Sequence, residues 1–584
     1  MKKLFTTLAL LAIFGLSANA QSLAWAKNWN SASDYNDQGY AITTDASGNV
    51  YVTGAAAIDH SGYSYIETIK YNSSGTIVWQ TPSPSGGTSG TDVGGAIALD
   101  NHGNTWVTGT AYNGATYMQN IVLIKYSPTG HIRPFYPKFY PVASGSMLSR
   151  GTCLAVVDST HVYVGGALYT NSSSTWALWV DKDYPGAAGW AWTNPYTKTG
   201  TIGSTYPHSA TDLKANSSNN VWVTGFINYS STGKDCWTAE LDASTGSQTW
   251  GKAFNGAANL DDAANAMYVD ANGNVWIVGY TTVSTGYKNA GIIEYNNTGT
   301  LQWDKTYTST YESVFTDIAM GIKCSAGIMV YAGGYVGTSL GDYKYILAAF
   351  DNTAQTFSSL WSPNPITYYG SSFGIHVSGT DQGYSVAFEP TTNRVYITGR
   401  SDETTTGINI TTLAYDACNG SNVWSASYDY NYDALLGGVD EMFWKYGMVV
   451  KYDVCGADAV YITGESQVSG HGFDYITLLY GYTGVPCDIV DPGDRLAHTG
   501  GEVQTGLYPN PFSTTAVLKL SPETELTNAV LSVYDISGRL VSSVNNITSN
   551  DIIINRGNLK NGLYYYTLSD NGTIITKGKF IIAD

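Results

Sequence analysis

Charged side chains are scarce in this chain. Asp, Glu, Lys and Arg make up 13% of its 584 residues, about half of the roughly 25% found in an average soluble protein. Helical bundles and coiled coils need far more Glu, Lys, Leu and Ala, so this composition excludes them. Glycine (64 residues), tyrosine (46) and tryptophan (16) are plentiful instead. That combination favours an all-β protein of short strands and tight turns.

Several motifs of catalytic and metal sites are also missing. The sequence has no H-E-x-x-H, no C-x-x-C and no Walker-type loop, and its eight His are scattered. Its net charge is −18 and we find no basic stripe, which excludes nucleic-acid binding. The six cysteines lie at least 32 residues apart, so they do not form a zinc motif, and both disulfides and buried thiols remain open. We expect no metal and no required cofactor.

Only one segment resembles a membrane-directed sequence, and it is too short to span a bilayer. Residues 1–20 combine Lys2 and Lys3, an apolar stretch from Leu4 to Leu16, and the small residues Ala18-Asn19-Ala20. This order is typical of a cleaved secretory signal peptide. Its removal would take the formal charge to −20. We therefore expect no transmembrane segment and a secreted or cell-surface protein that passes through the periplasm.

A ten-residue block of the form D-x-x-G-N-V-Y-V-T-G recurs along the chain. It begins at residues 45, 100, 216 and 270 in its clearest copies, and looser copies bring the number to eight. The closing glycines are Gly54, Gly109, Gly166, Gly225, Gly279, Gly334, Gly399 and Gly464. Each copy lies in a unit that reads as four strands, and the fourth strand usually carries a tryptophan. Repeated four-stranded units predict a β-propeller.

The ends of the repeat array predict a closed ring. The last unit lacks its fourth strand, whereas residues 23–30 (LAWAKNWN) supply an unassigned strand with Trp25 in the matching place. We expect this first strand to complete the last blade and remove an exposed sheet edge. The sequence thus predicts an eight-bladed propeller over residues 21–485, with seven blades as the alternative.

The repeat pattern resembles the SBBP propeller repeat of secreted bacterial proteins. After a Gly- and Pro-containing linker (486–504), residues 505–584 carry LYPNPF, LSVYDISGRLV and LKNGLYYYTL in order. In order and spacing these motifs are similar to the C-terminal sorting domain of the type IX secretion system of Bacteroidetes. The resemblance implies export across the outer membrane by that secretion machinery, and the segment reads as a small C-terminal β-sandwich.

Three patterns in the repeats are candidates for chemistry, and each has a structural alternative. Asp37, Asp92, Asp262 and Asp381 precede innermost strands, so they either ring the channel as a cation site or cap the turn that enters each blade. The D-x-x-G-N turns either bind calcium or hydrogen-bond their own backbone. Residues 337–341 match the nucleophile formula G-x-S-x-G but no helix follows. We favour the structural alternative in all three cases.

The long loops offer the best candidate binding surface, because the first-to-second and third-to-fourth strand turns are tight and form a plain face. Exposed aromatic rings beside carboxylates suit sugar binding. The candidate ligand-binding residues are Tyr206, Asp381, Asp440, Glu441, Phe443, Trp444 and Tyr446.

Three functions fit these features. The first is a non-catalytic binding or adhesion protein whose ligand is a glycan or a surface protein. The second is a polysaccharide-acting hydrolase or lyase, which requires two carboxyl groups facing each other across a cleft. The third is a structural component of a surface matrix.

Overall fold

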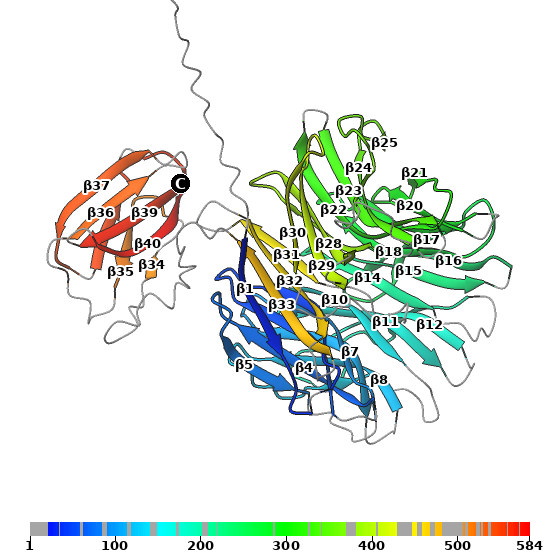
Figure 1. Ribbon diagram of the computed structural model, residues 1–584. Helices are drawn as coiled ribbons and strands as arrows, with labels where there is room; N and C mark the ends of the chain where they lie inside the picture. Colours follow the sequence, from blue (N-terminus) through cyan, green and yellow to red (C-terminus); the bar gives the residue numbers. More distant parts are fainter. Residues whose placement is uncertain are drawn as a thin grey trace, which may run out of the picture. The chain divides into compact units, whose positions relative to one another are not determined.

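The computed structural model describes residues 22–481 and 506–583 with internal gaps. The gaps are residues 34, 59–61, 84–89, 114–117, 141–148, 171–174, 188, 201–207, 219, 230, 284–286, 325–326, 340–341, 369–380, 404–406, 429–446, 453–457, 468–472, 509–511, 521–525, 527–528, 535–538, 550, 558 and 571–572. The chain divides into two compact units, residues 1–489 and 490–584. In both units the described secondary structure consists of β-strands (Figure 1).

The first half of the first unit forms four antiparallel four-stranded sheets, numbered here in chain order. Sheet 1 contains β2 (Gln38–Thr44), β3 (Val50–Ala57), β4 (Ser64–Tyr71) and β5 (Ile77–Pro82). Sheet 2 contains β6 (Val93–Leu99), β7 (Thr105–Asn113), β8 (Met118–Tyr126) and β9 (Lys138–Phe139). Sheet 3 contains β10 (Arg150–Asp158), β11 (His161–Thr170), β12 (Thr175–Lys182) and β13 (Tyr196–Lys198). Sheet 4 contains β14 (Ser209–Ala215), β15 (Asn220–Tyr229), β16 (Gly233–Asp242) and β17 (Gln248–Phe254).

The second half continues the pattern. Sheet 5 contains β18 (Asp262–Val269), β19 (Val275–Thr282), β20 (Lys288–Tyr295) and β21 (Leu301–Tyr307). Sheet 6 contains β22 (Ser313–Cys324), β23 (Gly327–Ser339), β24 (Asp342–Asp351) and two short strands, β25 (Thr356–Phe357) and β26 (Ile366–Tyr368). Sheet 7 contains β27 (Gln382–Glu389), β28 (Arg394–Glu403), β29 (Gly407–Asp416) and β30 (Asn422–Tyr428). Sheet 8 contains β31 (Met448–Tyr452), β32 (Asp458–Gln467), β33 (Phe473–Gly481) and the first strand, β1 (Ser22–Trp29).

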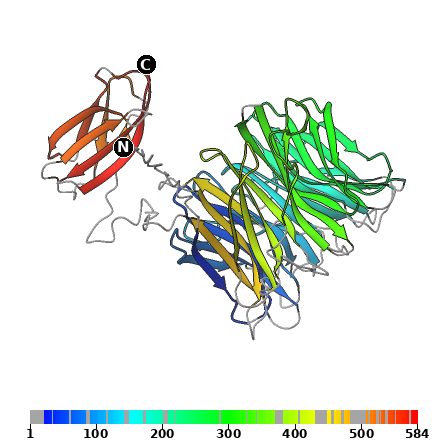
Figure 2. The same cartoon turned by 45° about the horizontal axis from the view of Figure 1, so that its top comes forward.

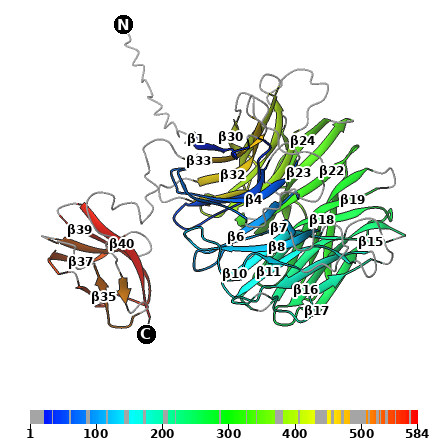
Figure 3. The same cartoon turned by 90° about the horizontal axis from the view of Figure 1, so that it is seen from below.

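The eight sheets of this unit follow one another around a ring, as in a β-propeller (Figures 2 and 3). The innermost strands touch in sequence, from β2 to β6, β10, β14, β18, β22, β27 and β31, and β31 touches β2 again. The pairing of β1 with β33 confirms that the N-terminal strand completes the last sheet. The ring is therefore closed by non-covalent pairing of segments from the two ends of the repeat array.

The burial of each strand follows from its place in the sheet. The second and third strands are covered by both neighbouring sheets, and β3 (VYVTGAAA) is accordingly buried at every residue. The fourth strands lie at the outside and alternate, as in β5, where Trp79 is buried between exposed neighbours. Adjacent sheets share a core: Tyr51 and Ile66 of sheet 1 pack with Val107 and Val122 of sheet 2.

In sheets 1 to 7 the repeated closing glycine is required by a bulge in the first strand. In sheet 1 the register between β2 and β3 shifts between Gly39 and Ala41. A Cβ on Gly54 would lie 1.9 Å from the carbonyl oxygen of Gln38, which no side chain tolerates. The closing glycines from Gly109 to Gly399 have the same close approach to their own first strands, at 1.9–2.0 Å.

The second unit contains a three-stranded and a four-stranded sheet. The first is ordered β34 (Gly506–Tyr508), β35 (Thr515–Lys519), β38 (Asp551–Asn555). The second is ordered β37 (Leu540–Ile547), β36 (Ala529–Tyr534), β39 (Gly562–Asp570), β40 (Thr573–Ile582). Both contribute to one hydrophobic core, in which Leu518 and Ile552 pack with Leu531, Leu568 and Phe580.

Candidate functional site

Six of the seven sequence-predicted ligand residues lie outside the described residues. These are Tyr206, Asp440, Glu441, Phe443, Trp444 and Tyr446. The seventh, Asp381, is buried at 4% exposure just before β27. Its Oδ1 accepts a hydrogen bond from the backbone N–H of Asp402 at 2.8 Å.

The other three acids of the predicted ring also accept a hydrogen bond from a backbone N–H of the second strand in their sheet. Oδ1 of Asp37 accepts the N–H of Ala57 at 2.8 Å, and Oδ1 of Asp262 accepts the N–H of Thr282 at 2.9 Å. Asp92 accepts the N–H of Tyr112 in the same way. Each carboxylate thus fastens the start of the first strand to the end of the second strand in its own sheet. This geometry supports the capping alternative over a channel cation site.

In sheets 3 and 4 a residue other than aspartate accepts the equivalent hydrogen bond. Oγ of Ser149 accepts the N–H of Tyr169 at 3.2 Å, and Nδ1 of His208 accepts the N–H of Asn228 at 2.9 Å. Burial lowers the pKa of His208 to about 4, so its ring is neutral at pH 7 and can accept. The shared requirement is a hydrogen-bond acceptor, not a negative charge.

The D-x-x-G-N turns use their carboxylates internally. Oδ1 of Asp45 accepts the N–H groups of Ser47 and Asn49, and Oδ2 accepts from Asn49 Nδ2 and the Tyr51 hydroxyl. Both carboxylate oxygens already accept hydrogen bonds from within the turn, and a calcium ion would have to displace these donors. This supports the turn alternative. Within the described ranges, no three His, Cys, Asp or Glu side chains are grouped as metal ligands.

The G-x-S-x-G segment does not form a nucleophile elbow. Residues 337–339 are the end of β23, and the next strand, β24, begins at Asp342. The elbow needs a helix immediately after the serine, whereas here a strand begins three residues after Ser339.

The cysteines divide into two groups. Cys153 and Cys236 are buried thiols that form no disulfide, whereas Cys418 is disulfide-bonded. The first two thiols pack as small apolar side chains, and burial raises the pKa of Cys236 to about 12, which makes that thiol unreactive.

One carboxyl group is buried without a structural equivalent elsewhere in the ring. Glu67 of β4 pairs with the closing glycine Gly54 and is 2% exposed. The other sheets place uncharged residues at this position, namely Val122, Trp179, Trp237, Gly291, Ile346, Thr411 and Ile476. Burial, followed by the charge of Asp37, raises the pKa of Glu67 to about 8, so this side chain is mostly protonated at pH 7.

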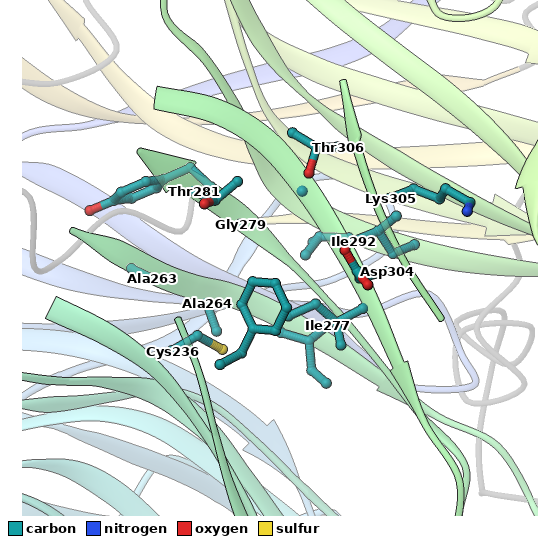
Figure 4. Close-up of a pocket in the computed structure, with 15 residues that line it drawn as sticks. Cys236, Ala263, Ala264, Ile277, Gly279, Thr281, Ile292, Asp304, Lys305 and Thr306 are labelled. Atoms are coloured by element: carbon teal, nitrogen blue, oxygen red, sulfur yellow. The ribbon is translucent and has the colours of Figure 1, made fainter. Parts of the chain in front are cut away.

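A small cavity lies between sheets 4 and 5 (Figure 4). Cys236, Ala264, Ile277 and Ile292 surround it. It exists because Gly279 pairs with Gly291, so two adjacent strands both lack a side chain there. Its volume of about 20 Å³ is sufficient for one water molecule, and it is not a ligand site.

A much larger depression, the outer groove, lies where sheet 3 meets sheet 4. It is lined by residues 191–197 and 244–248 and has a volume of about 640 Å³, which is within the range of small-ligand sites. Its lining contains the buried rings of Trp192 and Tyr196. Among the exposed lining residues are Thr193, Asn194, Thr197, Ser244, Ser247 and Gln248.

The outer groove is the feature that sequence reasoning missed, since the third-to-fourth strand turns were expected to form a plain face. In sheets 1, 4, 5 and 7 the fourth-strand tryptophan follows the last residue of the third strand by eight residues. Trp192 follows Lys182 by ten, and it precedes a fourth strand of only three residues, β13. The two-residue difference in spacing was the available signal.

Comparisons with solved structures return proteins with 8–12% identity. One is Sqt1 from Chaetomium thermophilum (12% identity, 78% of this chain and 99% of that chain, TM-score 0.41). Another is the β-propeller domain of the Trilobed protease from Pyrococcus furiosus (8% identity, 69% and 98%, TM-score 0.32). A third is the WD40 domain of SCAP from fission yeast (9% identity, 78% and 98%, TM-score 0.27). No curated protein matches this chain significantly.

The C-terminal unit is assigned by its sequence. Residues 506–583, which include β34 to β40, match the family model of the secretion system C-terminal sorting domain. Among the described residues, no helix is long and apolar enough to cross a membrane. The chain therefore carries a sorting domain after its β-propeller, and that domain marks it for type IX secretion to the cell surface or the extracellular space.

Proposed function

We propose that this chain is an exported, non-catalytic binding protein, and that its ligand is a carbohydrate. The propeller acts as a rigid eight-bladed scaffold of SBBP-type repeats, followed by a C-terminal β-sandwich that docks on the type IX machinery of a Bacteroidetes cell. Residues 1–20 act as the signal peptide. Binding requires no cofactor, and the ligand contacts include Asp440, Glu441, Phe443, Trp444 and Tyr446, which precede β31 in the chain, together with Tyr206.

The main support for this proposal is that the four acids before the innermost strands serve as structural hydrogen-bond acceptors. A glycosidase needs a carboxyl group free to donate or accept a proton and a second one to attack or to activate water. Asp37, Asp92, Asp262 and Asp381 are each at most 4% exposed and each accepts a backbone N–H. Acids held in this way support a scaffold role for the described ring.

The test is a screen of the full-length protein against a panel of polysaccharides, with a reducing-end assay on every polysaccharide that binds. Retention without new reducing ends is the expected result. New reducing ends that disappear in Asp440→Asn or Glu441→Gln would overturn the proposal and make the chain a hydrolase. Absence of binding to every polysaccharide would overturn the carbohydrate assignment.

A further inference from the structure

We infer that the outer groove is a binding site for a neutral oligosaccharide, an inference that rests on the proposed function and gives it a second site. The groove lies at the turn that joins β16 to β17 within sheet 4, whereas the residues named for the first site lie between the fourth strand of one sheet and the first strand of the next. The two sites are therefore separable by mutation.

The lining of the outer groove is polar but uncharged. None of its twelve lining residues is Asp, Glu, Lys, Arg or His. A charged ligand would lose hydration there without gaining a counter-charge. Hydroxyl and amide groups such as those of Thr193, Asn194 and Ser247 can both donate and accept, as sugar hydroxyls do.

Sheet 4 supplies one wall of the groove in a fixed form. Oδ1 of Asp242 accepts the N–H groups of Ser244 and Thr245 at 3.0 and 2.8 Å. The Trp192 indole Nε1 donates to the carbonyl oxygen of Ala243 at 3.1 Å, and Gly246 lies against its ring. The turn is thus held from inside by its own carboxylate and from the neighbouring sheet by an indole.

A hydrogen bond across the groove holds the side chain of Gln248 in place. The Tyr196 hydroxyl donates to Oε1 of Gln248 at 2.9 Å, and the Trp237 indole donates to the Tyr196 oxygen at 3.1 Å. Because Oε1 of Gln248 is engaged, its amide N–H₂ group remains as the donor. Walls fixed before binding reduce the entropy lost on binding.

A short fourth strand accompanies the groove in sheet 3. The fourth strands of sheets 4 and 5, β17 and β21, each have seven residues, whereas β13 has three. The irregular residues 191–195 stand where sheets 1, 4, 5 and 7 have a fourth strand of six or seven residues. Space therefore remains beside the 244–248 turn, and a full fourth strand would fill that space.

The experiment is affinity electrophoresis of the full-length protein in gels containing laminarin, galactomannan or dextran as neutral probes. Gels with alginate or polygalacturonate provide the anionic probes. The test variants are Asn194→Ala and Gln248→Glu. The second keeps an acceptor for the Tyr196 hydroxyl but replaces the amide donor with a charged oxygen. Gln302→Glu is the matched control, because Gln302 is an exposed glutamine on the fourth strand of sheet 5.

We expect retention by a neutral probe, weakened about ten-fold or more by Gln248→Glu and less by Asn194→Ala, with Gln302→Glu unchanged. Wild-type levels of binding in both groove variants would overturn the groove site and leave the proposed function standing. Loss of all binding in Trp444→Ala would also overturn the groove site and leave the proposed function standing, because all binding would then depend on the first site. Binding of anionic probes alone would overturn the neutral class. A wild-type protein that binds none of the five probes would overturn the groove inference, whereas the wider panel decides the proposed function.

Discussion

The indole Nε1 of Trp25 donates a hydrogen bond to the carbonyl oxygen of Ser73 at 3.0 Å, and Gly75 lies against the indole ring. Trp25 belongs to the strand that completes sheet 8, and Ser73 belongs to the turn between β4 and β5 of sheet 1. Trp79 makes the equivalent bond from sheet 1 to Pro128 of sheet 2, at 3.0 Å. The contact between sheets 8 and 1, which closes the ring, thus has the same indole hydrogen bond as the contact between sheets 1 and 2.

Removal of this indole should weaken ring closure. We expect Trp25→Phe to lower stability by about 1 kcal/mol through the lost hydrogen bond. Trp25→Ala should cost roughly 2–3 kcal/mol because ring burial is lost as well. The measurement is thermal unfolding of the full-length protein followed by near-ultraviolet circular dichroism. Val78→Ala, at an exposed position of β5, is the control, and equal midpoints for wild type and Trp25→Ala would contradict the role of the indole.

The sequence predicted the features that repeat and failed where the structure departs from the repeat. Trp25 was predicted to close the ring because the last unit lacked the strand that Trp25 carries. Asp37 and Asp262 left two interpretations open, since a carboxylate before a strand fits both a cap and a cation site until its acceptor bonds are known. The outer groove was missed because the turns between third and fourth strands were expected to be uniformly tight, and only the longer spacing from Lys182 to Trp192 marks the exception.

The acids that precede the first strands should stabilise the fold as hydrogen-bond acceptors, and their negative charge should not be required. Asp262 accepts the N–H groups of Thr282 and Gly256. Asp262→Ala leaves both donors buried without a partner and should cost about 2–4 kcal/mol. His208→Asp should be tolerated far better than His208→Ala, because aspartate does this work in sheets 1, 2, 5 and 7. Denaturant midpoints of the three variants check the prediction, and a His208→Asp midpoint as low as that of His208→Ala would argue against it.

Glu67 should make stability fall as pH rises. Its pKa is about 8 in the folded chain against an ordinary value of 4.5, so between these two pH values the folded state holds a proton that the unfolded state has lost. The stabilisation is complete below pH 4.5 and is lost as pH rises through 8. Glu67→Gln mimics the protonated form and should remove this dependence, with a difference on the order of a few kcal/mol between pH 4.5 and pH 9. Urea midpoints across that range provide the measurement. Parallel pH profiles for wild type and Glu67→Gln would show that Glu67 does not titrate as inferred.

The cavity beside Gly291 should accept a methyl group. An alanine Cβ there would meet only the carbonyl oxygen of Lys305, at 3.9 Å, and Gly291 lies in the interior of β20. Gly291→Ala should therefore stabilise the protein by about 0.4–1 kcal/mol through reduced freedom of the unfolded chain. Gly279→Ala, across the same strand pair, should destabilise it because its Cβ would lie 1.9 Å from the carbonyl oxygen of Ala263. Calorimetric midpoints of the two variants that shift in the same direction would contradict this account of the cavity.

A buried ion pair joins sheets 2 and 3. Lys138 Nζ lies 2.5 Å from Oδ1 of Asp183, and both side chains are almost fully buried. The Tyr136 hydroxyl donates to the other carboxylate oxygen at 2.6 Å. Lys138→Met leaves a buried carboxylate without its cation and should cost about 3–5 kcal/mol.

Replacement of both partners should recover most of that loss, since Lys138→Met with Asp183→Leu removes both charges together. Denaturant unfolding of the two single variants and the double variant measures the coupling. The result that contradicts the prediction is additivity, in which the double variant loses as much as the two single variants combined. Non-additivity would show that the pair fixes the junction between the two sheets through mutual neutralisation and not through separate contacts of each side chain.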